Sequence, residues 1–96
     1  MALESHWKLN ALASLHWRQW EGEWVVFDEG SGQTHQMDTL TATALMAVDA
    51  FPISFQELES RVAESLLLSV TCELSDALHR ISLGLQAIGL IECTVV

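Results

Sequence analysis

Positive charge is what this sequence has least of. Its 96 residues include 4 Lys and Arg against 13 Asp and Glu, which gives a formal net charge of −9. The cations are scattered along the chain, at Lys8, Arg18, Arg61 and Arg80. Binding to a phosphate backbone draws its affinity from clustered Lys and Arg side chains. We therefore expect no nucleic acid among the partners of this protein.

Long hydrophobic runs are also missing. No stretch approaches the roughly 20 apolar residues that a membrane span needs, and the N-terminus has an early acid but no apolar signal-peptide core. The two cysteines, Cys72 and Cys93, form no CxxC pair of the kind that holds a metal. One disulfide between them is arithmetically possible, but two reduced, partly buried thiols are the expected state in a cytoplasmic protein. We expect no membrane association.

Catalytic and cofactor motifs are absent as well. The sequence contains no GxGxxG, Walker A, HExxH or GxSxG motif. Its four histidines lack the spacing of metal ligands: His6, His16, His35 and His79. Acidic pairs such as Asp28 and Glu29 are interpreted as solvated faces and caps, which are common in an acidic protein. We therefore expect a protein that is not an enzyme and that holds no metal or cofactor.

The hydrophobic pattern changes near Asp38. Before it, β-branched and aromatic runs alternate with turn formers, which is typical of strands. After it, apolar residues recur every three or four positions, which is typical of helices. This predicts one α+β domain over residues 1–96, with a three-stranded antiparallel sheet followed by three helices. Strands are expected near 15–20, 23–28 and 33–37, and helices near 40–48, 54–67 and 72–88. Residues 1–14 are interpreted as an extra strand or a packed arm, and residues 90–96 as a terminal strand or tail.

The expected helices carry recognisable end signals. Asp38 or Thr39 can cap the first helix, and Ser54 with Glu57 forms a capping box at the start of the second. Gly89 stands where a glycine ends the third helix in the left-handed conformation. The third helix also has the clearest apolar stripe, which we interpret as its core face. That stripe consists of Leu74, Leu78, Ile81, Leu85 and Ile88.

Tryptophan supplies most of the aromatic surface, since the chain has no tyrosine. The four residues are Trp7, Trp17, Trp20 and Trp24. Their ordinary role is packing between a sheet and its helices. Trp17 and Trp20 fall on opposite faces of one strand by period-two counting. At least one aromatic residue is therefore expected at the rim, where a partner could cover it.

The strand half of the chain carries a resemblance to a known family. The motif runs Trp17-x-x-Trp20-x-Gly22-Glu23-Trp24-Val25-Val26-Phe27-Asp28, then Ser31-Gly32-x-Thr34-His35 and Met37-Asp38 before an Ala/Leu helix. With it the chain resembles the PqqD-like family over nearly its whole length, and within that family the subgroup encoded beside proteins related to HPr kinase. The elements Trp7-x-Leu9-Asn10 and Gly89-Leu90-Ile91-Glu92 fit the same subgroup. Met37 departs from the usual leucine, a swap that cores tolerate.

The resemblance implies a winged helix-turn-helix-like fold that recognises peptides. In the family, a ribosomally made precursor (leader) peptide lies along the third strand and against the third helix. It is then presented to a modifying enzyme. The expected partners are therefore a precursor peptide, a peptide-modifying enzyme and, as a candidate, an HPr kinase-related protein. The strand residues that map onto this site are Gln33, Thr34, His35, Gln36 and Met37.

The residues themselves support the same site. A short meander leaves an edge strand whose free backbone groups a peptide can pair with by β-augmentation. The third helix also has a mixed face away from its apolar stripe, and its members are further peptide-binding candidates: Asp76, Arg80, Leu83 and Ala87. Leu83 is apolar where solvent is expected, although exposed leucines can be incidental. Gly84 is costly inside a helix; we interpret it as admitting close approach of the sheet, or else of a ligand backbone.

Two other functions stay open. A DNA-binding winged-helix regulator has the same elements, but its recognition helix would carry several cations, and the third helix here has only Arg80. A structural or activating subunit of an enzyme complex would show the same apolar rim without binding a peptide. A short precursor reading frame beside modification enzymes in the genome would favour peptide recognition.

Overall fold

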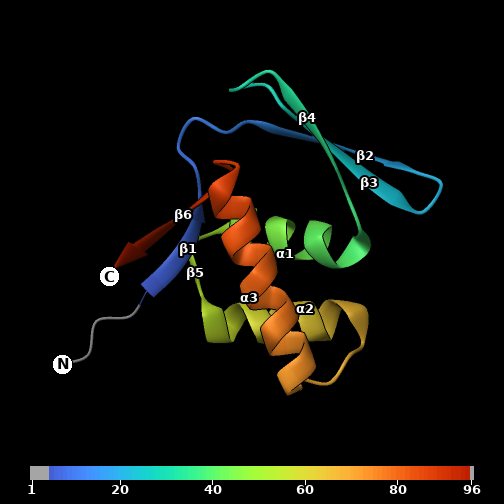
Figure 1. The fold of residues 1–96 in the computed structure, drawn as a ribbon, viewed down its shortest axis with the longest axis vertical. Coiled ribbons are helices and arrows are strands. Elements are labelled where there is room, and N and C mark those ends of the chain that lie inside the picture. Colours follow the sequence, from blue (N-terminus) through green and yellow to red (C-terminus); the bar gives the residue numbers. More distant parts are fainter. Residues whose placement is uncertain (1–4, 96) are drawn as a thin grey trace.

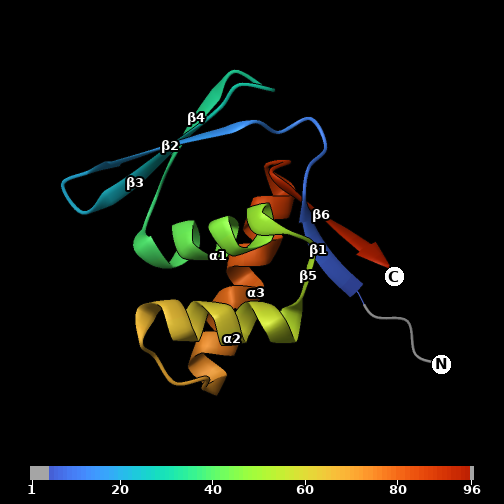
Figure 2. The same ribbon diagram turned by 180° about the vertical axis from the view of Figure 1, so that it is seen from behind.

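The chain folds into two small antiparallel sheets beside three helices (Figures 1 and 2). The computed structural model describes residues 5–95. The elements are β1 (Ser5–Leu9), β2 (Leu15–Trp20), β3 (Glu23–Asp28), β4 (Gln33–Met37), α1 (Thr39–Ala50), β5 (Ile53–Ser54), α2 (Phe55–Leu66), α3 (Cys72–Ala87) and β6 (Ile91–Val95). The predicted α+β class, the three-stranded antiparallel sheet and the three helices after it are confirmed.

The predicted sheet forms from β2, β3 and β4, with β3 in the middle. β2 and β3 are joined by Glu21 and Gly22, both of which have positive φ, at 49° and 81°. Two-residue turns with this backbone match the twist of a hairpin. In the resulting register Trp17 lies opposite Val26. The rings of Trp17 and Trp24 meet edge to face, with centroids 5.9 Å apart, and Trp17 packs against the core.

The end of the β3–β4 hairpin is tied to the loop before β2. The nearly buried carboxylate of Asp28 accepts hydrogen bonds from the backbone N–H groups of Ser14 and Gly30, both at 3.0 Å, and from the Ser31 hydroxyl at 2.9 Å. Position 30 requires glycine, because a Cβ there would lie 1.8 Å from the carbonyl oxygen of Leu12. These contacts fix the place where β4 starts.

A second sheet contains both ends of the described chain, where the sequence had left a strand, an arm or a tail as alternatives. β1 lies between β5 and β6 and is antiparallel to both. Trp7 stands opposite Ile53 on one side and Cys93 on the other. The N-terminal segment is therefore a strand from Ser5, and the C-terminal segment is a strand rather than a tail; residues 1–4 lie outside the described part. Trp7 and Leu9 pack against the core from this sheet.

Side-chain caps start all three helices. The caps are Asp38 for α1, Ser54 for α2 and Thr71 for α3, and each accepts a hydrogen bond from the backbone N–H three residues later. Gly89 follows α3 with φ 82°, as predicted. α2 ends at Leu66, and Leu67 follows it as a cap in the left-handed conformation, with φ 56°.

One cluster of buried side chains joins the helices to both sheets. Its largest apolar members that are fully buried are Leu45, Ile53, Leu58, Leu78, Leu90, Val26, Val48 and Val62. All but one residue of the predicted α3 stripe is buried or packs against this cluster. The exception is Ile88, which is 49% exposed. Its assignment to the core is wrong, because α3 ends at Ala87 and Ile88 lies just past the last turn that the core covers.

The two cysteines are free, and both are exposed. The prediction of partly buried thiols is therefore wrong. Cys72 is the first residue of α3 and follows an exposed loop, residues 67–71. Cys93 lies on β6, which runs away from the helices towards the C-terminus (Figure 1). Neither position is covered by the core.

Candidate functional site

β4 is an edge strand. It pairs with β3 on one side, and no strand of the described chain pairs with its other side. Edge strands of this kind present a row of backbone N–H and C=O groups that can accept a further strand. The position of β4 in the sheet therefore leaves an unpaired strand edge over residues 33–37, which makes this strand a candidate binding site.

A groove lies between β4 and the C-terminal half of α3. It encloses about 440 Å³. Its lining comes from three elements and the residue after α3: Thr34, His35, Gln36 and Met37 of β4, Thr41 of α1, Ile81, Gly84 and Leu85 of α3, and Ile88. In Figure 1, β4 lies above this end of α3. The free strand edge thus runs beside a cavity whose opposite wall is the third helix.

Not every predicted site residue lines this groove. Gln33 is exposed at the start of β4, opposite Asp28, outside the lining. On α3, the candidates from the mixed face are all exposed, and none lines the groove: Asp76, Arg80, Leu83 and Ala87. Successive helix residues are about 100° apart. The lining residues Ile81, Gly84 and Ile88 therefore lie one position further round the helix than the predicted face.

The helical wall was missed because its residues belong to an apolar stripe. Ile81, Leu85 and Ile88 share the periodicity of a core face, and the core covers that face only in part. The available signal was the position of Ile88 directly before Gly89, where no further helical turn can cover it. Gly84 would have no heavy atom within 4 Å of an added Cβ. The predicted close approach of the sheet at Gly84 is therefore wrong, and the glycine leaves open space in the wall.

His35 holds an unpaired polar atom at this groove. Its Nε2 is shielded from solvent and has no hydrogen-bond partner among residues 5–95. The residue is half-buried, stands opposite Val26 in the sheet and lines the groove. A buried polar group without a partner costs about 1–3 kcal/mol. The described chain therefore offers no hydrogen-bond partner to this nitrogen of a groove-lining residue.

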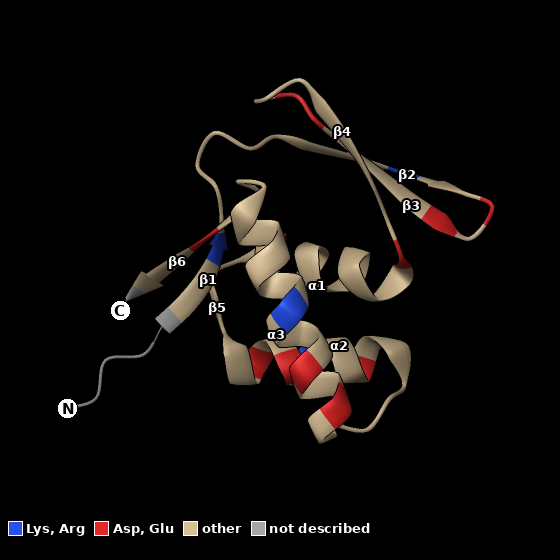
Figure 3. Cartoon of the chain, viewed as in Figure 1, with Lys and Arg blue, Asp and Glu red and all other residues tan. Residues whose placement is uncertain are grey.

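The groove is uncharged, while its surroundings are acidic. None of the nine lining residues is a Lys, Arg, Asp or Glu. Figure 3 shows acidic segments at the far end of α3, at the β3–β4 turn and at the start of α1. At the start of α1, the N–H and hydroxyl of Thr41 lower the pKa of Asp38, so this carboxylate is an anion at neutral pH. A bound segment would meet neutral walls flanked by negative charge.

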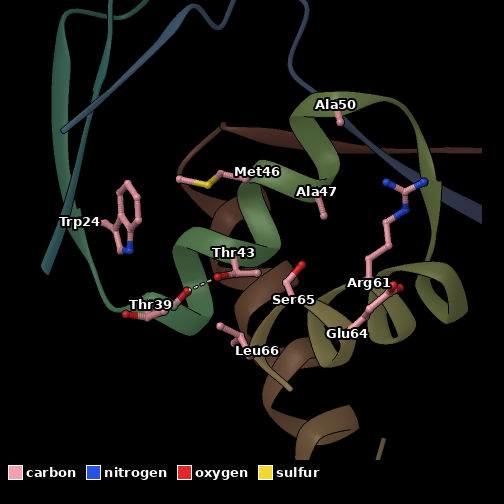
Figure 4. Close-up of a pocket in the computed structure, with 10 residues that line it drawn as sticks. All are labelled: Trp24, Thr39, Thr43, Met46, Ala47, Ala50, Arg61, Glu64, Ser65 and Leu66. Atoms are coloured by element: carbon pink, nitrogen blue, oxygen red, sulfur yellow. Dashed lines mark hydrogen bonds between the residues drawn. The ribbon is translucent and has the colours of Figure 1, made fainter. Parts of the chain in front are cut away.

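A larger cavity, of about 750 Å³, lies between β3, α1 and α2 (Figure 4). It is lined by Trp24, Thr39, Thr43, Met46, Ala47, Ala50, Arg61, Glu64, Ser65 and Leu66. The Thr43 hydroxyl donates to the carbonyl oxygen of Thr39 at 2.7 Å, and the Arg61 guanidinium lies 4.1 Å from the centre of the Phe51 ring. Both polar groups thus have partners within the chain. Among the described residues that line it, no buried polar atom is unpaired, and we favour the smaller groove for this reason.

The outer face of the β2–β3–β4 sheet carries exposed aromatic residues. Trp20 is 66% exposed and Phe27 is 40% exposed. Trp17 and Trp24 are half-buried. The prediction that at least one aromatic residue stands at the rim is confirmed. Trp20 and Phe27 both belong to this outer face, near opposite ends of the β2–β3 hairpin, and neither lines the groove.

Comparison with protein-family models, curated proteins and solved structures finds no match to this chain. The resemblance to the PqqD-like family therefore stays a prediction that rests on the sequence motif. Within residues 5–95, no three His, Cys, Asp or Glu side chains lie together in a way that could hold a metal ion. Over the same range, no helix has both the length and the apolar character needed to cross a bilayer.

Proposed function

We propose that this chain is a peptide-recognition domain that binds an extended segment of a precursor peptide along the free edge of β4. One observation carries the proposal: the unpaired edge of β4 and the groove against α3 are formed by the same residues, 34–37. The bound segment pairs with the strand backbone, and every second side chain turns towards α3. The domain performs no chemistry of its own.

The charge distribution supports a peptide with basic residues outside the groove. The protein carries a formal net charge of −9, and the groove itself holds no charged side chain. Long-range attraction between opposite charges speeds encounter more than it tightens the final contact. Lys or Arg flanking an uncharged central segment would therefore raise the association rate without facing desolvation inside the groove.

Presentation of the peptide needs a second surface. The exposed rings of Trp20 and Phe27 provide one on the outer face of the sheet, and exposed aromatic patches are typical of protein contacts. We assign this face to the modifying enzyme or to an HPr kinase-related protein, in the cytoplasm. An activating subunit would use the same face without a peptide on β4. Peptide binding at β4 therefore distinguishes a peptide-recognition domain from an activating subunit.

The test is a peptide-display selection on the whole chain, followed by a backbone N-methylation scan of the strongest binder. In an added strand, alternate N–H groups point towards the edge. Methylation should therefore weaken binding at every second residue and be tolerated at the residues between. Amide chemical shifts should change chiefly over residues 33–37 and 81–88. The proposal would be overturned if the selection enriched no peptide. It would also be overturned if N-methylation showed no alternating effect on binding and the chemical-shift changes centred on the cavity of Figure 4.

A further inference from the structure

The unpaired nitrogen of His35 indicates what the groove selects. We propose, on the basis of the proposed function, that His35 is a specificity-determining residue. It forms a hydrogen bond with a neutral polar side chain of the bound segment. The segment then carries Ser, Thr, Asn or Gln beside His35 and an apolar residue two positions away. Nε2 has no partner in the described chain, and the bound segment supplies one.

The spacing of the motif follows from the strand. His35 and Met37 are two residues apart on β4, both are half-buried, and both line the groove. A strand paired with this edge turns its own side chains inward at the same period of two. One inward side chain of the occupant therefore lies beside His35 and the next beside Met37. Ile88 and the open space at Gly84 form the opposite wall.

The neutrality of the selected side chain follows from the lining. With no Lys, Arg, Asp or Glu in the wall, a charged side chain would lose its hydration without gaining an ionic partner. A hydroxyl or carboxamide can donate and accept, so it pairs with either tautomer of a neutral imidazole. Nε2 is shielded from solvent in the free chain, so this hydrogen bond requires the half-buried His35 side chain to turn when the segment binds.

The experiment repeats the display selection on the wild-type chain, His35→Leu and His35→Gln. Peptides selected by the wild type should show Ser, Thr, Asn or Gln two residues from an apolar residue. His35→Leu should lose the polar preference and keep the apolar one. His35→Gln should keep both, because its carboxamide can still form the hydrogen bond. The melting temperature of each variant, measured beside the wild type, verifies that it is folded.

A matched pair of peptides then measures the contact without any protein variant. Two copies of the selected peptide differ only by Thr or Val at the position beside His35, side chains of nearly equal shape. The wild type should bind the Thr peptide about tenfold more tightly, the scale of one net hydrogen bond. His35→Leu should bind the two peptides equally. Fluorescence anisotropy with labelled peptides gives both ratios.

The outcomes separate this inference from the proposed function. If the wild type binds the Thr and Val peptides equally, or selects Asp or Glu beside His35, the specificity role is wrong while binding at β4 stands. The same holds if His35→Leu keeps the preference for Thr. If no peptide shows alternating sensitivity to N-methylation, the proposed function fails and the role of His35 fails with it.

Discussion

The carboxylate of Asp28 accepts a hydrogen bond from the backbone N–H of Ser14 at 3.0 Å, which ties the end of β3 to the loop that leads into β2. The N–H of Gly30 donates to the same oxygen. Donors of this kind favour the ionised carboxyl, and they hold the pKa of Asp28 below its ordinary value of 3.8, although burial opposes the shift. β4 begins just after this turn. The ionised carboxylate of Asp28 therefore stabilises the turn that precedes β4.

Acid should remove this contribution. Because the pKa of Asp28 in the folded protein lies below its unfolded value, the stability it contributes is full above about 3.8 and is lost as pH falls through the folded pKa. Asp28→Asn should melt at a lower temperature than the wild type at neutral pH, and the gap should close in acid. Circular-dichroism melts across this range measure the gap. Asp76→Asn, at an exposed position on α3, is the control. If the difference in melting temperature between the wild type and Asp28→Asn stayed constant into strong acid, the expectation would be contradicted.

Two exposed apolar residues of the α3 segment separate the groove from the neighbouring face. Ile88 is 49% exposed and lines the groove, whereas Leu83 is 59% exposed and does not. Ile88→Asp should weaken peptide binding by on the order of 1–2 kcal/mol, the scale of a lost apolar contact. Leu83→Asp should have a smaller effect, and both should melt close to the wild type. Titration calorimetry with a selected peptide measures the difference.

Leu85→Asp provides the folding reference for this pair. Leu85 is 4% exposed in the core cluster, and a carboxylate there would be buried without a partner. This variant should unfold the domain. If Leu83→Asp weakens binding as much as Ile88→Asp does, the peptide lies over the mixed face of Asp76, Arg80, Leu83 and Ala87 rather than in the groove.

The first sheet and the helices could be predicted because their signals are local. Glu21-Gly22 specifies a tight turn, and Asp38 and Ser54 cap helices from within one turn of the chain. The second sheet carries no local signal of its pairing. Trp7 and Cys93 meet across it from the two ends of the chain, and only the packing of the whole core brings those ends together.

The strand side of the candidate site could be predicted from the sequence, but the helix side could not. A three-stranded meander must leave edges, so residues 33–37 were available as a binding strand. On the helix, periodicity shows which residues share a face and does not show where the core stops covering it. For that reason the sequence predicts one core stripe that contains Ile81, Leu85 and Ile88. The unpaired nitrogen of His35 depends on every atom around it and has no signature in the sequence.

Replacing His35 by leucine should stabilise the free protein. The change removes a buried nitrogen without a hydrogen bond and places an apolar side chain among the apolar residues of the groove. The free energy of unfolding should rise by about 1 kcal/mol, which corresponds to roughly 4–8 °C in the melting temperature for a domain of this size. Thermal melts at neutral pH test this. A lower melting temperature would mean that the imidazole is satisfied in solution.

Gly84 should show stability and binding moving in opposite directions. It lies inside α3, where glycine is less favourable than alanine by roughly 1 kcal/mol. An added Cβ would meet no heavy atom within 4 Å, so Gly84→Ala should raise the free energy of unfolding by about that amount. The same methyl group would project from a wall of the groove. Peptide binding should weaken by about 1 kcal/mol, the lower end of the cost of overpacking.

Ala87→Gly is the matched control for the opposite effects of Gly84→Ala on stability and on peptide affinity. Ala87 is exposed on α3 outside the groove, so its replacement by glycine should lower the melting temperature and leave peptide affinity unchanged. Melts and anisotropy titrations on the two variants and the wild type give a stability and an affinity for each. If Gly84→Ala binds the selected peptide as tightly as the wild type, the bound segment does not approach α3 at Gly84, and the groove is wider than its occupant.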